Sequence, residues 1–98
     1  MKLLDGLWRV ERTGGLLPPM IGVRKRVRGE RGETLIGPLL RWPFRLEDRA
    51  EHVALIYDPP FSSWVDELRP EEADAWSGTA TLAGREIGRF RMVRIDRT

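Results

Sequence analysis

Apolar and polar residues alternate along most of this chain, and glycine, proline or polar clusters interrupt the alternation at short intervals. A period of two is typical of a β-strand with one buried face, whereas an amphipathic helix repeats every 3.6 residues. Trp8 and Val10 alternate with charged neighbours near the start of the chain, and Phe90 and Met92 do so near its end. The interruptions divide the chain into about eight such segments, spaced roughly 8–12 residues apart. The pattern therefore predicts an all-β domain.

Short connections between these segments favour pairing of strands that are neighbours in sequence. The simplest topology is a small closed antiparallel up-and-down barrel of about eight strands, which side chains can fill or which can hold one small ligand. Closure suits a chain of 98 residues without cysteine, because a barrel has no free edges and no disulfide can reinforce the core. We predict one domain over residues 1–98, with at most one helical turn at residues 15–20 and at residues 71–75. Gly88 predicts a bulge or a close backbone approach in the last strand.

Charge and composition narrow the classes of partner. The 17 basic and 15 acidic side chains leave a net charge of +2. Arg24, Arg26 and Arg28 form a stripe on one face of a strand, but no aromatic residues share that face to stack on bases, which disfavours nucleic acid. The acidic segment 66–74 has the opposite charge, so the stripe of one copy could bind the acidic segment of another, and a homo-oligomer is an alternative. The chain shows no signal peptide and no stretch near the ~20 apolar residues of a membrane span, so we expect a cytoplasmic protein with no membrane partner.

Gly6 and Trp8 open the first predicted strand as Gly-x-Trp, and Arg89, Arg91 and Arg94 lie on the last one. This arrangement resembles the calycin superfamily of lipocalins, fatty-acid-binding proteins and nitrobindin-like barrels. The resemblance implies a lipocalin-like barrel in which Trp8 closes one end and Arg91 or Arg94 lies over the indole. A cation over a tryptophan face is favourable by ~0.5–2 kcal/mol. A ligand site is then expected toward the opposite end of the barrel.

Lys25 and Asp66 each alternate in step with apolar neighbours on their own strands. If those neighbours face the core, both charged side chains point into the barrel, where they could pair and orient a ligand. Arg91 or Arg94 is a second possible partner for a buried Asp66. The alternative is that either side chain lies near a barrel end and reaches water, as lysine readily does.

The aromatic residues provide further candidates for a binding site. The chain has four tryptophans, a high number for its length. Trp42 and Trp64, with Phe44 and Tyr57, are candidates to line a pocket for a flat or apolar ligand, and the alternative is that they fill the core. His52 is the only histidine. Nitrobindin-like barrels bind haem through a histidine, so the resemblance makes haem a candidate cofactor, although the polar turn around His52 favours an ordinary exposed side chain.

Three functions follow from these observations. The favoured one is binding of a small apolar or aromatic molecule in a lipocalin-like barrel. The second is a barrel without a cavity that acts as an oligomeric or partner-binding module. The third is a small cyclase-type or isomerase-type enzyme that uses Lys25 and Asp66. No nucleophile elbow, phosphate loop or metal-binding spacing occurs in the sequence, which favours binding over catalysis. The segment 56–59 is similar to uncharacterised bacterial barrel families.

Overall fold

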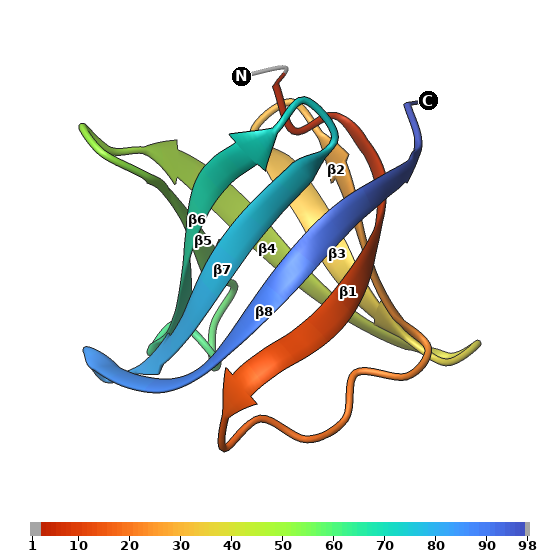
Figure 1. Cartoon of the computed structure of the whole chain (residues 1–98). Coiled ribbons are helices and arrows are strands. Elements are labelled where there is room, and N and C mark those ends of the chain that lie inside the picture. Colours follow the sequence, from red (N-terminus) through yellow and green to blue (C-terminus); the bar gives the residue numbers. More distant parts are fainter. Residues whose placement is uncertain (1–2, 98) are drawn as a thin grey trace.

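The computed structural model, which describes residues 3–97, is an eight-stranded antiparallel barrel that closes on itself (Figure 1). The hydrogen-bonded order of the strands follows the chain, and β8 pairs with β1 to complete the ring. The strands are β1 (Gly6–Gly15), β2 (Val23–Arg28), β3 (Arg31–Ile36), β4 (Leu40–Asp48), β5 (Val53–Tyr57), β6 (Trp64–Glu72), β7 (Ala75–Leu82) and β8 (Arg85–Asp96). The predicted all-β, closed, up-and-down architecture is therefore confirmed.

The connections gather at two ends of the barrel. The end that lies lower in Figure 1, which we call the loop end, carries the connections 16–22, 37–39, 58–63 and 83–84. The opposite end, which we call the terminal end, carries the chain termini and the connections 29–30, 49–52 and 73–74. Every inward-facing side chain can therefore be placed toward one end or the other.

The two predicted helical turns are wrong. Residues 71 and 72 continue β6, and Gly15 is the last residue of β1. The following connection contains Pro18 and Pro19, which have no backbone N–H to support a helical turn. In the part of the chain that the structure describes, no helix has the length and hydropathy needed to cross a membrane.

Gly88 satisfies both alternatives that the sequence left open. Ala80 pairs with Gly88 and Thr81 pairs with Glu86, so Ile87 is the extra residue of a β-bulge. A Cβ atom at Gly15 would lie 2.4 Å from the Cα of Gly88, so the two backbones approach closely, and the side chain of Leu17 packs directly over Gly88. The bulge and the missing side chain together admit the connection 16–22 against the barrel wall.

Side chains from all parts of the ring pack in the interior. Two phenylalanine rings each cover a glycine of a neighbouring strand. Phe44 lies over Gly32, and Phe90 lies over Gly78. A Cβ atom at Gly78 would lie 2.2 Å from the Phe90 ring. The largest fully buried side chains are those of Trp8, Phe44, Leu4, Leu55, Leu68 and Met92.

Trp8 closes the terminal end of the barrel. Its ring is wholly buried, and its Nε1 donates a hydrogen bond of 2.8 Å to the carbonyl oxygen of Leu4. The guanidinium carbon of Arg94 lies 4.5 Å from the centroid of the Trp8 ring. Arg94 also donates to the carbonyl oxygens of Asp5 and Leu3, at 3.1 Å and 2.7 Å. The arginine therefore covers the indole and holds the incoming chain at the same time.

Arg91, the other arginine proposed for this role, is not in contact with Trp8. It alternates with Phe90 and Met92, which are buried, so its own side chain lies on the outer face of β8. There it forms long ion pairs with Glu71 and Glu72, at 3.8 Å and 4.0 Å. Arg94 takes the role because it shares the inward direction of its strand.

Candidate functional site

Lys25 is a buried cation inside the barrel, with only 3% of its surface exposed. Its Nζ donates to Thr34 Oγ1 at 2.7 Å and to Tyr57 OH at 2.8 Å, and it lies 3.5 Å from Asp66 Oδ2. The hydroxyls of Thr34 and Tyr57 are themselves 2.8 Å apart. The three donors of the ammonium group therefore face three oxygens. We refer to Lys25, Thr34, Tyr57 and Asp66 as the Lys25 cluster.

Strand register explains how this cluster forms. Lys25 on β2 stands opposite Thr34 on β3, and Thr34 stands opposite Trp42 on β4. On the other side of β2, Lys25 stands opposite Trp8 on β1. One row therefore crosses the inner face of the barrel. It begins at the buried Trp8 at the terminal end and ends at the half-exposed Trp42 at the loop end, with Lys25 and Thr34 between them. The cluster lies between these two tryptophans.

Aromatic rings enclose the ammonium group. Lys25 Nζ lies 5.3 Å from the centroid of the Tyr57 ring and 5.6 Å from the centroids of both Phe44 and Phe90. These distances are within the range of cation–π attraction. Phe44 and Tyr57 also pack edge to face, with centroids 5.9 Å apart. The site thus combines a cation, a carboxylate and two hydroxyls within aromatic walls.

Burial and charge act against each other on the two ionisable groups. Burial raises the pKa of the Asp66 carboxyl above its ordinary value of 3.8, and the nearby Lys25 offsets only part of this effect. For Lys25, burial acts to lower the pKa, but Tyr57 and Asp66 together outweigh it and raise the pKa above 10.5. The partners of Lys25 therefore favour its charged form, whereas burial opposes the ionisation of Asp66.

Trp42 and Trp64 lie at the loop end and are 41% and 37% exposed, so the alternative that they fill the core is wrong for both. Each alternates in step with the inward-facing residues of its strand. Each nevertheless lies at or near the first residue of that strand, before the buried positions begin. Phe61, in the connection 58–63, packs against Trp42 with ring centroids 5.9 Å apart. We refer to Trp42, Phe61 and Trp64 as the aromatic rim. Phe44 and Tyr57, by contrast, lie beside Lys25.

The partner of Asp66 is Lys25, not Arg91 or Arg94. Arg94 is engaged over Trp8 at the terminal end, and Arg91 lies on the outer face. Asp66 is 6% exposed, so it needs a partner inside the barrel, and Lys25 is the cation that reaches it.

Sequence reasoning missed three residues of this region: Thr34, Phe61 and Phe90. A signal for Thr34 existed, because a two-residue turn at residues 29–30 pairs position 34 with Lys25 when one counts outward from it. No local signal existed for Phe61 or Phe90. Both reach the site through contacts between segments that are distant in sequence.

His52 lies outside the Lys25 cluster, in the connection 49–52 at the terminal end. Its carbonyl oxygen accepts a hydrogen bond of 2.9 Å from the backbone N–H of Arg49. Among residues 3–97, no three histidine, cysteine, aspartate or glutamate side chains are placed to hold a metal ion together.

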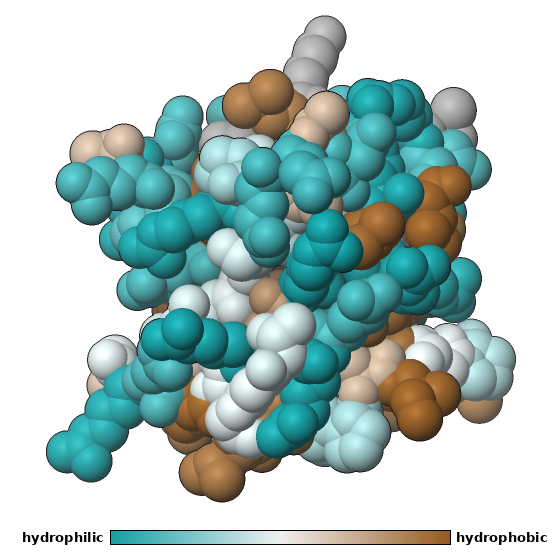
Figure 2. Space-filling view, viewed as in Figure 1, coloured by the Kyte–Doolittle hydropathy of each residue, from teal (hydrophilic) through white to brown (hydrophobic). Residues whose placement is uncertain are grey.

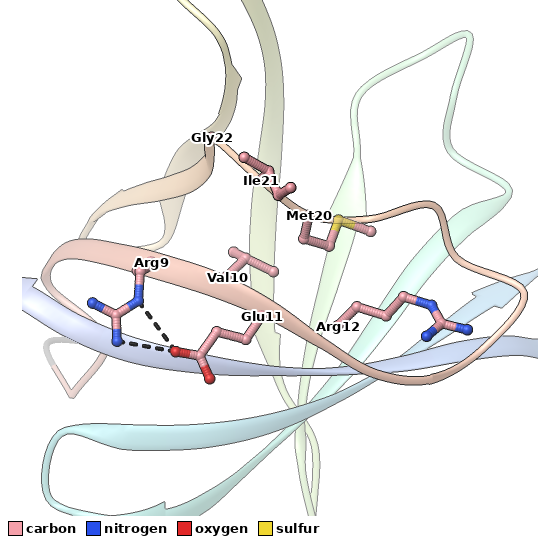
Figure 3. A pocket seen from close by; sticks show the side chains of 7 residues that line it. All are labelled: Arg9, Val10, Glu11, Arg12, Met20, Ile21 and Gly22. Atoms are coloured by element: carbon pink, nitrogen blue, oxygen red, sulfur yellow. Dashed lines mark hydrogen bonds and ion pairs between the residues drawn. The ribbon is translucent and has the colours of Figure 1, made fainter.

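A groove of about 350 Å³ lies where β1 extends past β2 (Figure 3). The pairing of β1 with β2 extends from Gly6 to Arg9, and the later part of β1 pairs with β8. Figure 3 shows the ion pair between Arg9 and Glu11, 3.0 Å long, at this groove. No residue of the Lys25 cluster lines it; the lining residues are Arg9, Val10, Glu11, Arg12, Met20, Ile21 and Gly22.

Fold and site together define a class of protein: a closed eight-stranded antiparallel barrel with a charged, hydrogen-bonded cluster in its interior. This architecture is consistent with the calycin-like fold that the Gly-x-Trp motif suggested. Comparisons with protein-family models, curated proteins and solved structures found no match to the chain. The geometry of the site is therefore the basis for a function.

Proposed function

We propose that this chain is a calycin-like binding protein that takes a small apolar or aromatic molecule at its loop end. The observation that carries the proposal is the Lys25 cluster, in which a buried cation and its polar partners are enclosed by aromatic rings. Ligand sites commonly combine apolar walls with a few placed polar groups that set orientation. The row that contains Lys25 and Thr34 ends at Trp42 on the aromatic rim, so a ligand that enters from the loop end would meet Trp42 before the cluster.

The proposed ligand has a flat apolar body and one polar group. The body would stack on the aromatic rim, since tryptophan and phenylalanine offer broad apolar faces. The polar group would face Tyr57, which is only half-buried and links the cluster to the loop end. A carboxylate or a phenolic oxygen suits this position, because Lys25 supplies positive charge behind the Tyr57 hydroxyl.

The energetics of the ion pair support a role beyond stability. Replacing a buried ion pair by apolar residues of similar volume is often neutral or stabilising. Lys25 and Asp66 occupy positions in a largely apolar interior that leucine or methionine could fill. Their presence is therefore better explained by recognition of a polar group than by the stability of the barrel.

Intrinsic fluorescence tests the proposal, because Trp42 and Trp64 are exposed whereas Trp8 and Trp76 are buried. The titrants are oleate, haem, salicylate and indole-3-acetate. We expect a saturable change with at least one of them, and Trp42→Phe should diminish the signal while Trp76→Phe should leave the change in place.

Tyr57→Phe supplies the affinity test, because it removes one hydroxyl and keeps the ring. We expect binding to weaken about fivefold, as for the loss of one hydrogen bond of about 1 kcal/mol. Arg91→Gln, on the outer face, is the matched control and should bind as the wild type does. Absence of saturable binding for all four titrants, or equal affinity in Tyr57→Phe and wild type, would contradict the proposal.

A further inference from the structure

The exposed large apolar side chains of this barrel are concentrated at one end. Seven of the nine lie at the loop end, and only Leu3 and Ile95 lie at the terminal end. Figure 2 shows hydrophobic side chains along the lower edge of the molecule, beneath a largely hydrophilic wall, with further hydrophobic side chains at the top and the upper right. At the loop end, the aromatic rim is joined by Leu16, Ile21, Leu39 and Leu40. We refer to this larger set as the apolar rim.

The exposure of the apolar rim is extreme at the tips of the connections. Leu16 is 90% exposed, Ile21 is 92% exposed and Leu39 is 86% exposed. These side chains belong to two separate connections, so they do not cover one another. Exposed apolar side chains that gather at one end and are bordered by charged residues are typical of an interaction surface.

Positive charge without a carboxylate partner lies beside the apolar rim. In the described part of the chain, Arg12, Arg24 and Arg85 form no ion pair. Arg12 instead donates to the carbonyl oxygens of Gly15 and Leu17, which leaves its charge uncompensated by any acid. Other arginines of this end are neutralised, as in the pairs of Arg41 with Glu33 and of Arg89 with Glu86. The residual charge at the loop end is therefore positive.

We propose that the loop end docks on the surface of an anionic lipid bilayer, with the apolar rim inserted at the acyl-chain boundary and Arg12, Arg24 and Arg85 at the level of the lipid phosphates. Apolar side chains that enter the interface and nearby cations that meet anionic headgroups add their contributions in peripheral binding. Tryptophan is favoured at this depth, which suits the half-exposed Trp42 and Trp64. We expected no membrane partner because the sequence has no stretch near the ~20 apolar residues of a membrane span, but docking of this kind needs no such stretch.

Charge favours a lipid surface over a second copy of the chain. Two copies joined through their loop ends would bring two positively charged surfaces together. Like charges placed together at an interface are unfavourable. A layer of anionic headgroups supplies the opposite sign instead. This inference goes beyond the proposed ligand binding, and neither depends on the other.

Vesicle sedimentation tests the inference. The full-length chain is mixed with vesicles of phosphatidylcholine alone or of phosphatidylcholine with phosphatidylserine. We expect sedimentation with the anionic vesicles, a decrease at high salt, and a blue shift of tryptophan emission that the variant Trp42→Phe/Trp64→Phe loses. The buried Trp8 and Trp76 should not contribute to that shift.

Matched variants separate docking from general stickiness. Ile21→Ser and Leu39→Ser change two highly exposed side chains, so the fold should persist, and each should lower partitioning about tenfold. Leu3→Ser, at the terminal end, is the apolar control and should partition as the wild type does. Arg24→Gln should lower partitioning about fivefold. Arg28→Gln should have no effect, because Arg28 is an exposed residue beside the turn 29–30 at the terminal end.

Three outcomes would overturn the inference. The first is no binding of the wild type to anionic vesicles. The second is equal weakening by Leu3→Ser and Leu39→Ser. The third is a concentration-dependent dimer, without vesicle binding, that Leu39→Ser dissociates, which would assign the apolar rim to a second copy. The ligand titrations described above contain no lipid bilayer, so failure of either proposal is recognised separately.

Discussion

Lys25 and Asp66 meet across the full width of the barrel. They belong to β2 and β6, which stand four strands apart in a ring of eight and are therefore opposite walls. Lys25 Nζ and Asp66 Oδ2 nevertheless lie 3.5 Å apart. An eight-stranded barrel is just wide enough for side chains to fill, so a long lysine and a short aspartate can span it. The pair ties the two walls together through the interior.

Replacing Lys25 by methionine should destabilise the protein. The change keeps an apolar stem of similar length but leaves Asp66, which is 6% exposed, without its cation. Removing one partner of a buried ion pair typically costs about 3–5 kcal/mol, so we expect a loss near the lower limit, since Asp66 can take up a proton. Urea unfolding followed by far-ultraviolet circular dichroism measures it.

The double variant Lys25→Met/Asp66→Asn completes a thermodynamic cycle with the two single variants. Because it removes both charges, it should recover part of the stability that Lys25→Met loses. Strictly additive effects of the two substitutions would contradict an interaction between these residues.

The stability of the wild type should depend on pH through Asp66. Burial raises the pKa of this carboxyl above 3.8, so the folded state holds the proton more tightly than the unfolded state does. Protonated Asp66 therefore contributes to the free energy of unfolding. This contribution is fully present below the pKa that Asp66 has in the unfolded state, and it is lost as pH rises through the pKa of the folded state.

Urea midpoints from about pH 3 to about pH 7 should therefore show the wild type losing stability relative to Asp66→Asn as pH rises. The comparison cancels groups common to both proteins, such as Glu47, whose pKa the hydrogen bonds from Arg49 and Arg45 lower. A difference that is constant with pH, or that grows in the opposite direction, would argue against a carboxyl strained by burial.

Much of the fold was predictable because its signals are local. Period-two alternation and turn residues each act within a few positions, and short connections leave little choice of partner strand. The alternation alone even distinguishes Arg94 from Arg91, because Arg94 shares the parity of Phe90 and Met92, which are buried. The helical turn expected at residues 71–75 is wrong because β6 and β7 form a tight hairpin, in which Glu72 pairs with Ala75 across the connection 73–74.

The sequence predicts which side chains of the site face the interior, but not where each of them lies along the barrel axis. Parity correctly turns Lys25 and Asp66 inward, and it gives Trp42 and Trp64 the same direction. Position along the barrel axis depends on the tilt and stagger of the strands, which no single strand encodes. Both tryptophans consequently lie at the loop end with large exposed areas, while the charged pair is buried.

Arg94→Met should destabilise the terminal end. The change removes the guanidinium group 4.5 Å from the Trp8 ring and the hydrogen bonds to the carbonyl oxygens of Leu3 and Asp5. One cation–π contact of ~0.5–2 kcal/mol and two hydrogen bonds of about 1 kcal/mol each together predict a loss of about 3 kcal/mol. Arg91→Met is the matched control on the same strand, and its exposed ion pairs should contribute less than about 1 kcal/mol. Similar thermal midpoints for the two variants would be inconsistent with the proposed plug.

Gly78→Ala should disturb the barrel wall and the Lys25 cluster together. The new methyl group would lie 2.2 Å from the Phe90 ring, which also lies 5.6 Å from Lys25 Nζ. Overpacking of this kind typically costs about 1–3 kcal/mol, because the ring must leave its position. Gly14→Ala is the matched control, since nothing lies within 4 Å of a Cβ at that strand position. Thermal unfolding should separate the two variants clearly, and equal stability would show that Phe90 does not depend on the glycine beneath it.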